Sequence, residues 1–183
     1  MLRVLRTLVA VASLVLAVPC LAPAQGKCEQ PILLTSAGQS ADVTIAAMLF
    51  KKVGLAVTSS PMAKVADLGG SKTLVVVAGF STKGLGSAGV NRDQEMERVK
   101  ALLAAARQRG VQVVLLHIGG KARRGPQSDE FNRVAAGAAG HLIVVRAGDE
   151  DQFFTKLAGD RKIGIDLVDK IADAAQPLGR LFQ

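Results

Sequence analysis

The chain contains no tryptophan and no tyrosine in 183 residues, and only two cysteines and two histidines. Proteins that bind single-stranded nucleic acid or sugars commonly stack the ligand's rings on such aromatic side chains. The formal net charge of +8 would otherwise suggest a nucleic-acid partner. We therefore expect no nucleic acid, and we interpret the basic balance either as a solvated surface or as an attraction for small anions.

A long hydrophobic run is also missing. The apolar run near the N-terminus extends from Leu8 to Val18, whereas a helix that spans a bilayer needs roughly 20 residues. Two arginines precede this run and Ala22-Pro23-Ala24 follows it, which is the order of a secretory signal peptide and its cleavage site. Residues 1–24 are predicted to be removed. The remaining chain is expected to be periplasmic or secreted, with no stable membrane insertion.

Removal of the signal peptide would leave Cys28 as the one remaining cysteine. A single thiol forms no intramolecular disulfide, so the stability of the exported protein has to come from its core. A lipid anchor on Cys20 is the alternative. Ala17 and Pro19 disfavour it, because a lipoprotein cleavage motif typically has leucine and a small residue at these two positions.

Apolar, β-branched segments alternate with helical patterns along the rest of the chain. In the segment 92–110, for example, Met96, Val99 and Leu103 recur at the spacing of one helix face. Strands are predicted at 31–35, 55–58, 73–80, 111–120 and 141–146, and helices after Ser40, at 92–110, from Ser128, from Asp151, and from about 166 to 175.

This alternation predicts a single α/β domain over residues 25–183, with three layers and a mostly parallel five-stranded sheet. The expected strand order is 2-1-3-4-5, as in flavodoxin-like and other Rossmann-like folds. Ligands of open parallel sheets bind at the carboxyl edge, where the strand order reverses. The segments Ser36–Ser40 and Gly79–Val90 are expected to face each other there.

The segment Gly84–Gly89 matches the dinucleotide pattern G-x-G-x-x-G. In that motif the first glycine follows the strand directly, whereas four residues, Phe80 to Lys83, intervene here. An acidic residue is also missing at the end of the next strand, near His117. We expect no nicotinamide or flavin cofactor, and interpret the segment as a mobile glycine-rich loop.

Gly38-Gln39-Ser40 lies between a strand and a helix, a position that resembles the nucleophile elbow of the α/β-hydrolases. Ser40 with His117 would give a hydrolase, although no acidic partner is evident, and a serine at a helix start is commonly a cap. His117, Asp93 and Asp129 do not have the spacing of a metal motif. No catalytic residue and no metal are assigned.

Basic residues follow two of the predicted strands: Lys83 after the third, and Lys121, Arg123 and Arg124 after the fourth. Arginine binds carboxylate or phosphate through a two-pronged fork, and a helix N-terminus donates free N–H groups. The alternative is that these residues are ordinary surface charges. The predicted ligand-binding residues are Ser36, Gly38, Gln39, Ser40, Ser81, Lys83, His117, Arg123 and Arg124.

In the segments LLTSAGQSAD, GFSTKGLGSAGVNRDQE and HIGGKARRGPQSD, the chain resembles a group of secreted bacterial proteins known only as a domain of unknown function. The resemblance implies an exported single domain and brings no activity. Our leading hypothesis is an exported binding protein for a small carboxylate or phosphate, serving a transporter or sensor. The alternatives are an extracytoplasmic hydrolase-like enzyme that uses Ser40 and His117, and a protein-interaction module.

Overall fold

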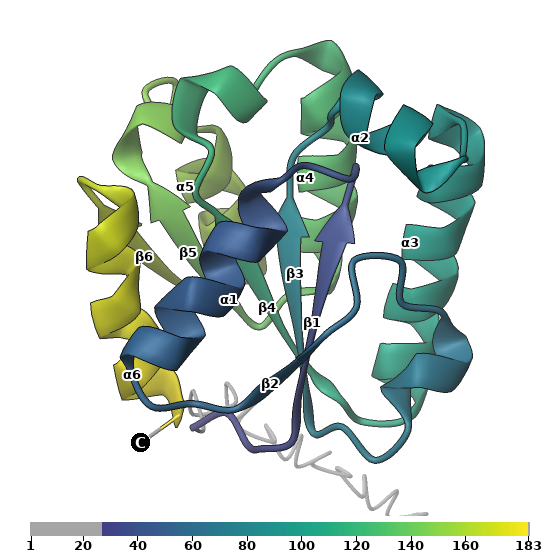
Figure 1. Ribbon diagram of the computed structural model, residues 1–183. Helices are drawn as coiled ribbons and strands as arrows, with labels where there is room; N and C mark the ends of the chain where they lie inside the picture. Colours follow the sequence, from purple (N-terminus) through teal and green to yellow (C-terminus); the bar gives the residue numbers. More distant parts are fainter. Residues whose placement is uncertain (1–26, 183) are drawn as a thin grey trace, which may run out of the picture.

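A computed structural model describes residues 27–182, so the predicted signal peptide, Cys20 included, lies outside the described residues. Six strands form one parallel sheet (Figure 1). They are β1 (Ile32–Ala37), β2 (Val57–Ser59), β3 (Thr73–Ala78), β4 (Gln112–His117), β5 (His141–Val145) and β6 (Gly164–Val168). Their order is β2-β1-β3-β4-β5-β6.

The α-helices are α1 (Asp42–Lys52), α2 (Thr82–Ala88), α3 (Arg92–Gln108), α4 (Pro126–Ala138), α5 (Phe153–Arg161) and α6 (Ala175–Phe182). The short 3₁₀ helices are η1 (Val65–Leu68), η2 (Gly120–Arg123), η3 (Arg146–Gly148) and η4 (Ile171–Ala174). Helix α3 begins with a capping box, in which Asn91 and Gln94 exchange hydrogen bonds between side chain and backbone N–H.

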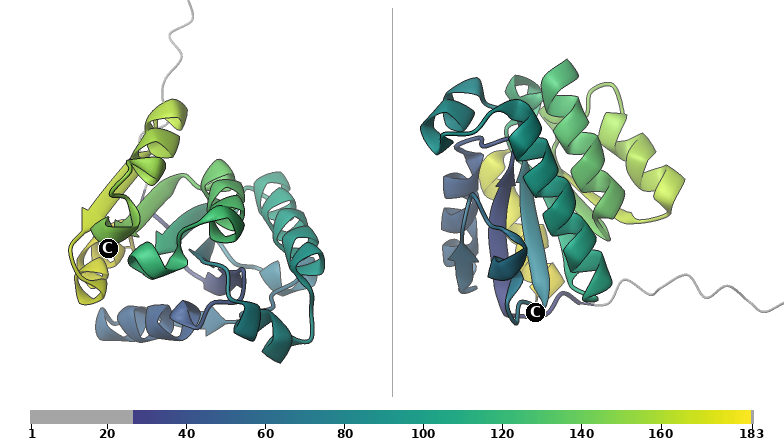
Figure 2. Two further views of the ribbon diagram at one scale, coloured as in Figure 1. Left: turned by 90° about the horizontal axis from the view of Figure 1, so that it is seen from above. Right: turned by 90° about the vertical axis from the view of Figure 1, so that its right-hand side faces the viewer.

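Successive strand residues point to opposite faces of the sheet, which divides the core in two. Leu74 and Val76 of β3 pack with α3, α4 and α5 on one face, while Val75 and Val77 pack with α1 and α6 on the other. Figure 2 shows the resulting three layers, with the sheet between the two groups of helices. The three-layer α/β class and the order of the first five strands are as predicted.

The predicted strand count is wrong by one. We expected a helix from about 166 to 175, but residues 164–168 form the sixth strand, paired in parallel with β5. The reason is that apolar and polar residues alternate here, as in a strand. Ile165 and Leu167 pack against the core on the α3 side, with Asp166 between them. Asp166 instead pairs with His141 of β5 and Arg180 of α6. The last helix is α6, which follows η4.

The segment 80–90 is also more ordered than the loop we expected, because α2 forms within it. Ser81 caps α2 by accepting a hydrogen bond from the backbone N–H of Gly84 at 3.1 Å. Gly89 ends it in the left-handed conformation, with φ 68°. Gly84 therefore lies inside a helix, away from the end of β3, and the dinucleotide turn is absent from this segment.

Both ends of the described chain lie at the amino edge of the sheet, shown at the bottom of Figure 1. The backbone N–H of Cys28 donates to the carbonyl of Leu181 at 2.6 Å. Partial burial raises the pKa of the Cys28 thiol to about 11. Within residues 27–182, no helix combines the length and the apolar character that crossing a membrane requires.

Candidate functional site

The loops after β1, β3 and β4 converge at the carboxyl edge of the sheet, as predicted. Backbone N–H groups of Gly79 and Ser81 donate to Ala37 and Gly38 at 2.9 and 2.8 Å, which joins the first two loops. The third is joined to the second, because the N–H of Phe80 donates to the Ser128 hydroxyl at 3.2 Å. The convergence therefore rests on specific hydrogen bonds and not on strand order alone.

Two glycines allow this close approach. Gly38 has φ 97°, and a Cβ atom there would lie 2.7 Å from the carbonyl oxygen of Gly79. A Cβ atom on Gly84 would overlap the carbonyl oxygen of Gln39, so only glycine lets α2 lie against the first loop. Two glycines of the segment that resembles a nucleotide motif therefore have structural roles. Gly84 allows α2 to pack against the first loop, and Gly89 ends α2.

A buried ion pair between two residues of α3 fixes the loop that follows β1. Glu95 of α3 is fully buried and accepts two hydrogen bonds from Arg98, each 2.8 Å long. The same carboxylate accepts from the backbone of Gly38 and from the side-chain amide of Gln39, at 2.9 and 3.0 Å. Arg98 also donates to the carbonyls of Ser36 and Ala63. Gly38 and Gln39 are therefore held by α3, and these donors are used within the fold.

Arg123 is the arginine that reaches this edge with donor groups to spare. Its Nε donates to Asp42 at 3.3 Å, and no other residue in the described part of the chain accepts from its two terminal nitrogens. Its side chain is 27% exposed. The aliphatic stem lies between two glycines: a Cβ on Gly79 would come within 3.1 Å of it, and one on Gly119 would overlap it.

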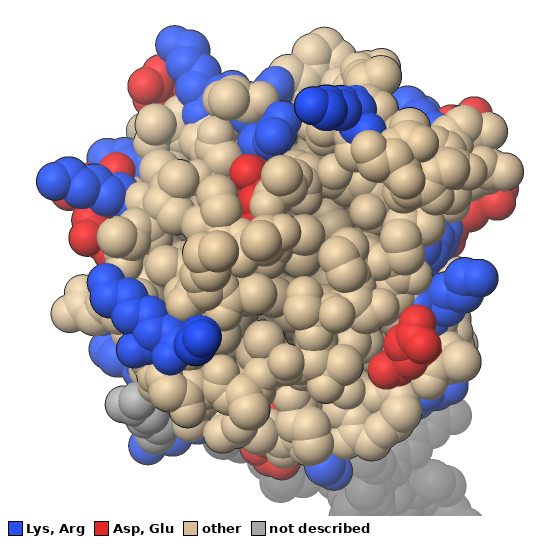
Figure 3. Space-filling model, viewed as in Figure 1, with Lys and Arg blue, Asp and Glu red and all other residues tan. Residues whose placement is uncertain are grey.

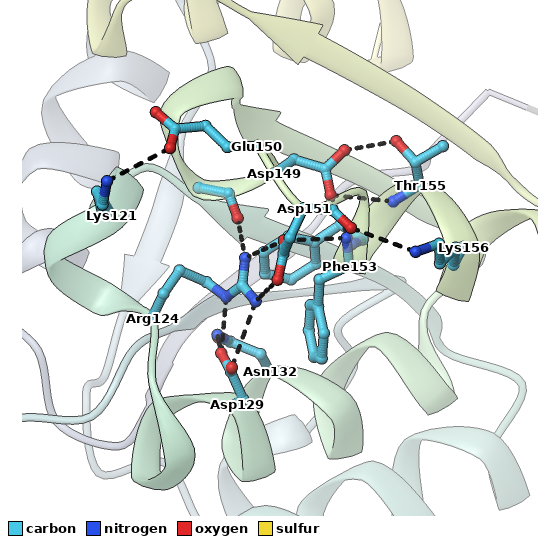
Figure 4. Close-up of polar contacts among 12 residues, drawn as sticks. Lys121, Arg124, Asp129, Asn132, Asp149, Glu150, Asp151, Phe153, Thr155 and Lys156 are labelled. Carbon is cyan, nitrogen blue, oxygen red and sulfur yellow. Dashed lines mark hydrogen bonds and ion pairs between the residues drawn. The ribbon is translucent and has the colours of Figure 1, made fainter.

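Arg124, by contrast, uses all five of its N–H donors within the fold (Figure 4). They go to Asp129, Asp151 and the carbonyl of Gly148. Its guanidinium also lies 4.4 Å from the centre of the Phe153 ring. These contacts raise the pKa of Arg124 and lower that of Asp151 through their mutual hydrogen bonds. Arg124 joins η2, α4 and α5, with no N–H left for a ligand.

Ser40 and His117, the two residues of the alternative hydrolase hypothesis, are both buried. Ser40 is 1% exposed, and its hydroxyl accepts from the backbone N–H of Asp42. His117 is fully buried, with its ring nitrogens 3.1 and 3.2 Å from the carbonyl oxygens of Ala78 and Gly120. Burial lowers the pKa of His117, so the neutral ring is favoured. Nothing within residues 27–182 joins Ser40 to His117 by a hydrogen bond.

The N-terminus of α1 is likewise occupied. Asp42, in its first turn, already supplies a carboxylate beside Arg123, which leaves little of the helix-dipole attraction for a second anion. Ser36 is fully buried beneath it. Lys83 is exposed on α2 and makes no ion pair with any residue that the structure describes.

A groove of about 560 Å³ lies between the loops after β3 and β4. Of the nine predicted site residues, it brings together Ser81, Arg123 and Arg124. The other six, Ser36, Gly38, Gln39, Ser40, Lys83 and His117, are not among its lining residues. The groove is lined by Phe80, Ser81, Thr82, Ala122, Arg123, Arg124, Gly125, Pro126, Gln127 and Ser128.

Sequence reasoning missed two groups of residues. Phe80, Thr82 and Ser128 line the groove but were not among the predicted ligand-binding residues. The pair of Glu95 and Arg98 had a usable signal, since Glu95 lies four residues before Val99 on the apolar face of α3. A carboxylate on such a face has to be partnered. In the described residues, no group of three or more His, Cys, Asp and Glu side chains is placed to hold a metal ion.

Residues 29–182 match the family model "Domain of unknown function (DUF6305)". The chain belongs to this family. No curated protein matches the chain. Among solved structures, a GDSL-like lipase from Bacteroides thetaiotaomicron is similar over 74% of this chain and 66% of its own, just under two thirds of its length. The identity is 11% and the TM-score 0.34, so this likeness carries no information on chemistry.

Proposed function

We propose that the protein is an exported binding protein for a small anion, which it holds in the groove beside Arg123. The observation that carries the proposal is the state of this guanidinium. One nitrogen is fixed by Asp42, the stem is seated between two glycines, and the two terminal nitrogens are directed to no protein acceptor in the described chain. A fixed guanidinium with free donors is suited to a carboxylate or phosphate oxygen.

The expected affinity is modest. A hydrogen bond to a charged group contributes about 1.5–3 kcal/mol, so two such bonds supply roughly 3–6 kcal/mol. A dissociation constant of about 1 mM corresponds to about 4 kcal/mol. We therefore expect millimolar to high-micromolar binding from Arg123 alone. On the face drawn in Figure 3, the lysine and arginine side chains are not gathered into one patch, so that face offers no broad basic surface as an alternative to a local site.

NMR titration with acetate and inorganic phosphate tests the proposal, since it detects millimolar binding. Arg123→Ala should weaken binding by at least about tenfold. Arg123→Lys should restore only part of it, because lysine lacks the fork. Arg109→Ala is the matched control: it removes the same charge from the exposed end of α3, far from the groove. If neither anion binds, or if both alanine variants behave alike, the proposal is wrong.

A second substitution, at Gly119, displaces the Arg123 side chain without replacing it. Gly119 has φ −77°, which alanine adopts freely, yet its Cβ would overlap the Arg123 stem and lie 2.5 Å from Oδ2 of Asp42. Gly119→Ala should therefore displace the guanidinium and weaken anion binding as Arg123→Ala does. Gly86→Ala, where a Cβ meets nothing within 4 Å, is its control and should bind as the parent does.

Export and service to a transporter or sensor remain part of the proposal. Their support is the signal-peptide pattern of residues 1–24, together with the groove beside Arg123 in the part of the chain that follows. The hydrolase and the interaction module remain the alternative hypotheses. The first lacks a hydrogen bond between Ser40 and His117, and the second would have to use a surface other than the groove, such as the exposed apolar side chains of Ile45 and Met48 on α1. Turnover of an ester that is lost in Ser40→Ala would favour the hydrolase.

A further inference from the structure

The groove beside Arg123 has an apolar wall. Phe80 is partly exposed and lines the groove, and its ring stacks on the buried Phe131 with ring centres 6.0 Å apart and 24° between the planes. Ala122 and Pro126 line the groove as well and are exposed. Phe80 is thus an aromatic residue supported from behind by the core and placed in the same groove as a guanidinium.

The polar lining is made largely of hydroxyl donors. Ser81 and Ser128 each accept a hydrogen bond from a backbone N–H, of Gly84 and Phe80 respectively. Each hydroxyl oxygen is therefore fixed while its own proton is left to donate, and no acceptor for either proton is found among residues 27–182. Thr82 adds a third hydroxyl. Fixed donors of this kind suit a ligand's oxygen atoms.

The cations of the groove suit a single anionic group. Two cations line it, Arg123 and Arg124, and Arg124 is already paired with Asp129 and Asp151. Arg123 contacts Asp42 through Nε alone, which leaves its two terminal nitrogens for a ligand. A dianion such as hydrogen phosphate would need a second cation with free donors among the lining residues, whereas the fork of Arg123 suits one carboxylate.

We propose that the ligand is a small organic monocarboxylate with a planar apolar body, bound with its carboxylate on Arg123 and its body against Phe80. This inference rests on the proposed function and names one chemical class of ligand for it. The groove volume of about 560 Å³ is far larger than an inorganic anion requires, and it falls within the range typical of sites for small organic ligands.

The test compares acetate, benzoate and inorganic phosphate by NMR titration of the same unaltered protein, at constant pH and ionic strength. Benzoate should bind about twofold to tenfold more tightly than acetate, the effect of one aromatic contact, and more tightly than phosphate. Phe80→Leu keeps an apolar side chain on Phe131 but loses the ring. It should reduce the benzoate-to-acetate ratio toward one.

The possible failures are distinguishable. If benzoate and acetate bind equally, or if phosphate binds most tightly, the inference is overturned while the proposed anion site stands. An unchanged benzoate-to-acetate ratio in Phe80→Leu also overturns it, because Phe80 then contributes nothing. If none of the three anions binds, the proposed function itself fails. Because the ratio is first measured on the unaltered protein, the test does not depend on the variant folding.

Discussion

Replacement of Glu95 by glutamine should destabilise the protein more than any other conservative change of a single charged residue in α3. The carboxylate is fully buried and accepts from four donors, two of them on Arg98. Glutamine has nearly the same shape, but it is neutral and turns an N–H₂ group toward donors. The substitution would leave Arg98, whose side chain is 9% exposed, as a buried cation without its counter-charge.

Breaking a buried ion pair in this way costs about 3–5 kcal/mol. For a domain of this size, each kcal/mol lowers the melting temperature by about 2–4 °C, so we expect a fall of roughly 6–20 °C. Urea denaturation followed by far-UV circular dichroism is the appropriate assay, because the chain has no tryptophan or tyrosine to report by fluorescence. Glu97→Gln, an exposed residue on the same helix, is the control and should change stability little.

A second variant separates two contributions to the loss of stability, the unpaired charge of Arg98 and the lost hydrogen bonds. Glu95→Gln combined with Arg98→Met removes the uncompensated cation, so the double variant should be more stable than the sum of the single effects predicts. A loss below about 1 kcal/mol in Glu95→Gln, or strict additivity in the double variant, would refute the reasoning. Either result would mean that the pair is solvated and does not hold the loop at Gly38.

Two further predictions concern pH and export. Burial lowers the pKa of His117 below its ordinary value of 6.5. The unfolded chain therefore binds a proton on this ring more readily than the folded chain does. The contribution of the neutral ring to the unfolding free energy is complete above about pH 6.5 and is lost as the pH falls below that value. The unfolding free energy should therefore decline between about pH 6.5 and 5, above the range in which carboxylates titrate, and less steeply in His117→Gln than in the unaltered protein; equal slopes would contradict this. Intact-mass analysis of the exported protein should show a chain that begins at Gln25, whereas retention of residues 1–24 or a lipid on Cys20 would argue against the predicted cleavage.

The fold was predictable for the strands that are buried on both faces of the sheet, because their sequences are mostly apolar. β1, β3 and β4 are nearly continuous apolar runs, and strand-helix alternation is enough to order them. β6 was missed because it is an edge strand of intermediate exposure, where Asp166 interrupts the apolar run and its short alternation also fits one turn of a helix. The helix α2 was missed because two glycines lower its intrinsic preference, which its cap and its contacts outweigh.

The convergence of the loops at the carboxyl edge was predictable, but not the state of the charges in the candidate site. Parallel topology alone places Arg123 and Arg124 at the same edge of the sheet. Which of them remains free depends on Asp129 and Asp151, which arrive from α4 and the segment before α5. Adjacent arginines of identical chemistry thus have opposite roles, one structural and one available. Only the tertiary contacts distinguish them.

The backbone hydrogen bond between Cys28 and Leu181 brings the two ends of the described chain together at the edge of the sheet opposite the groove. A tag or a surface linker joined to either end would therefore point the groove outward. Immobilisation through one end should leave small molecules free to enter, which suits the protein to measurement on a sensor surface. The same arrangement would let a short connecting peptide close the chain into a ring without reaching the groove.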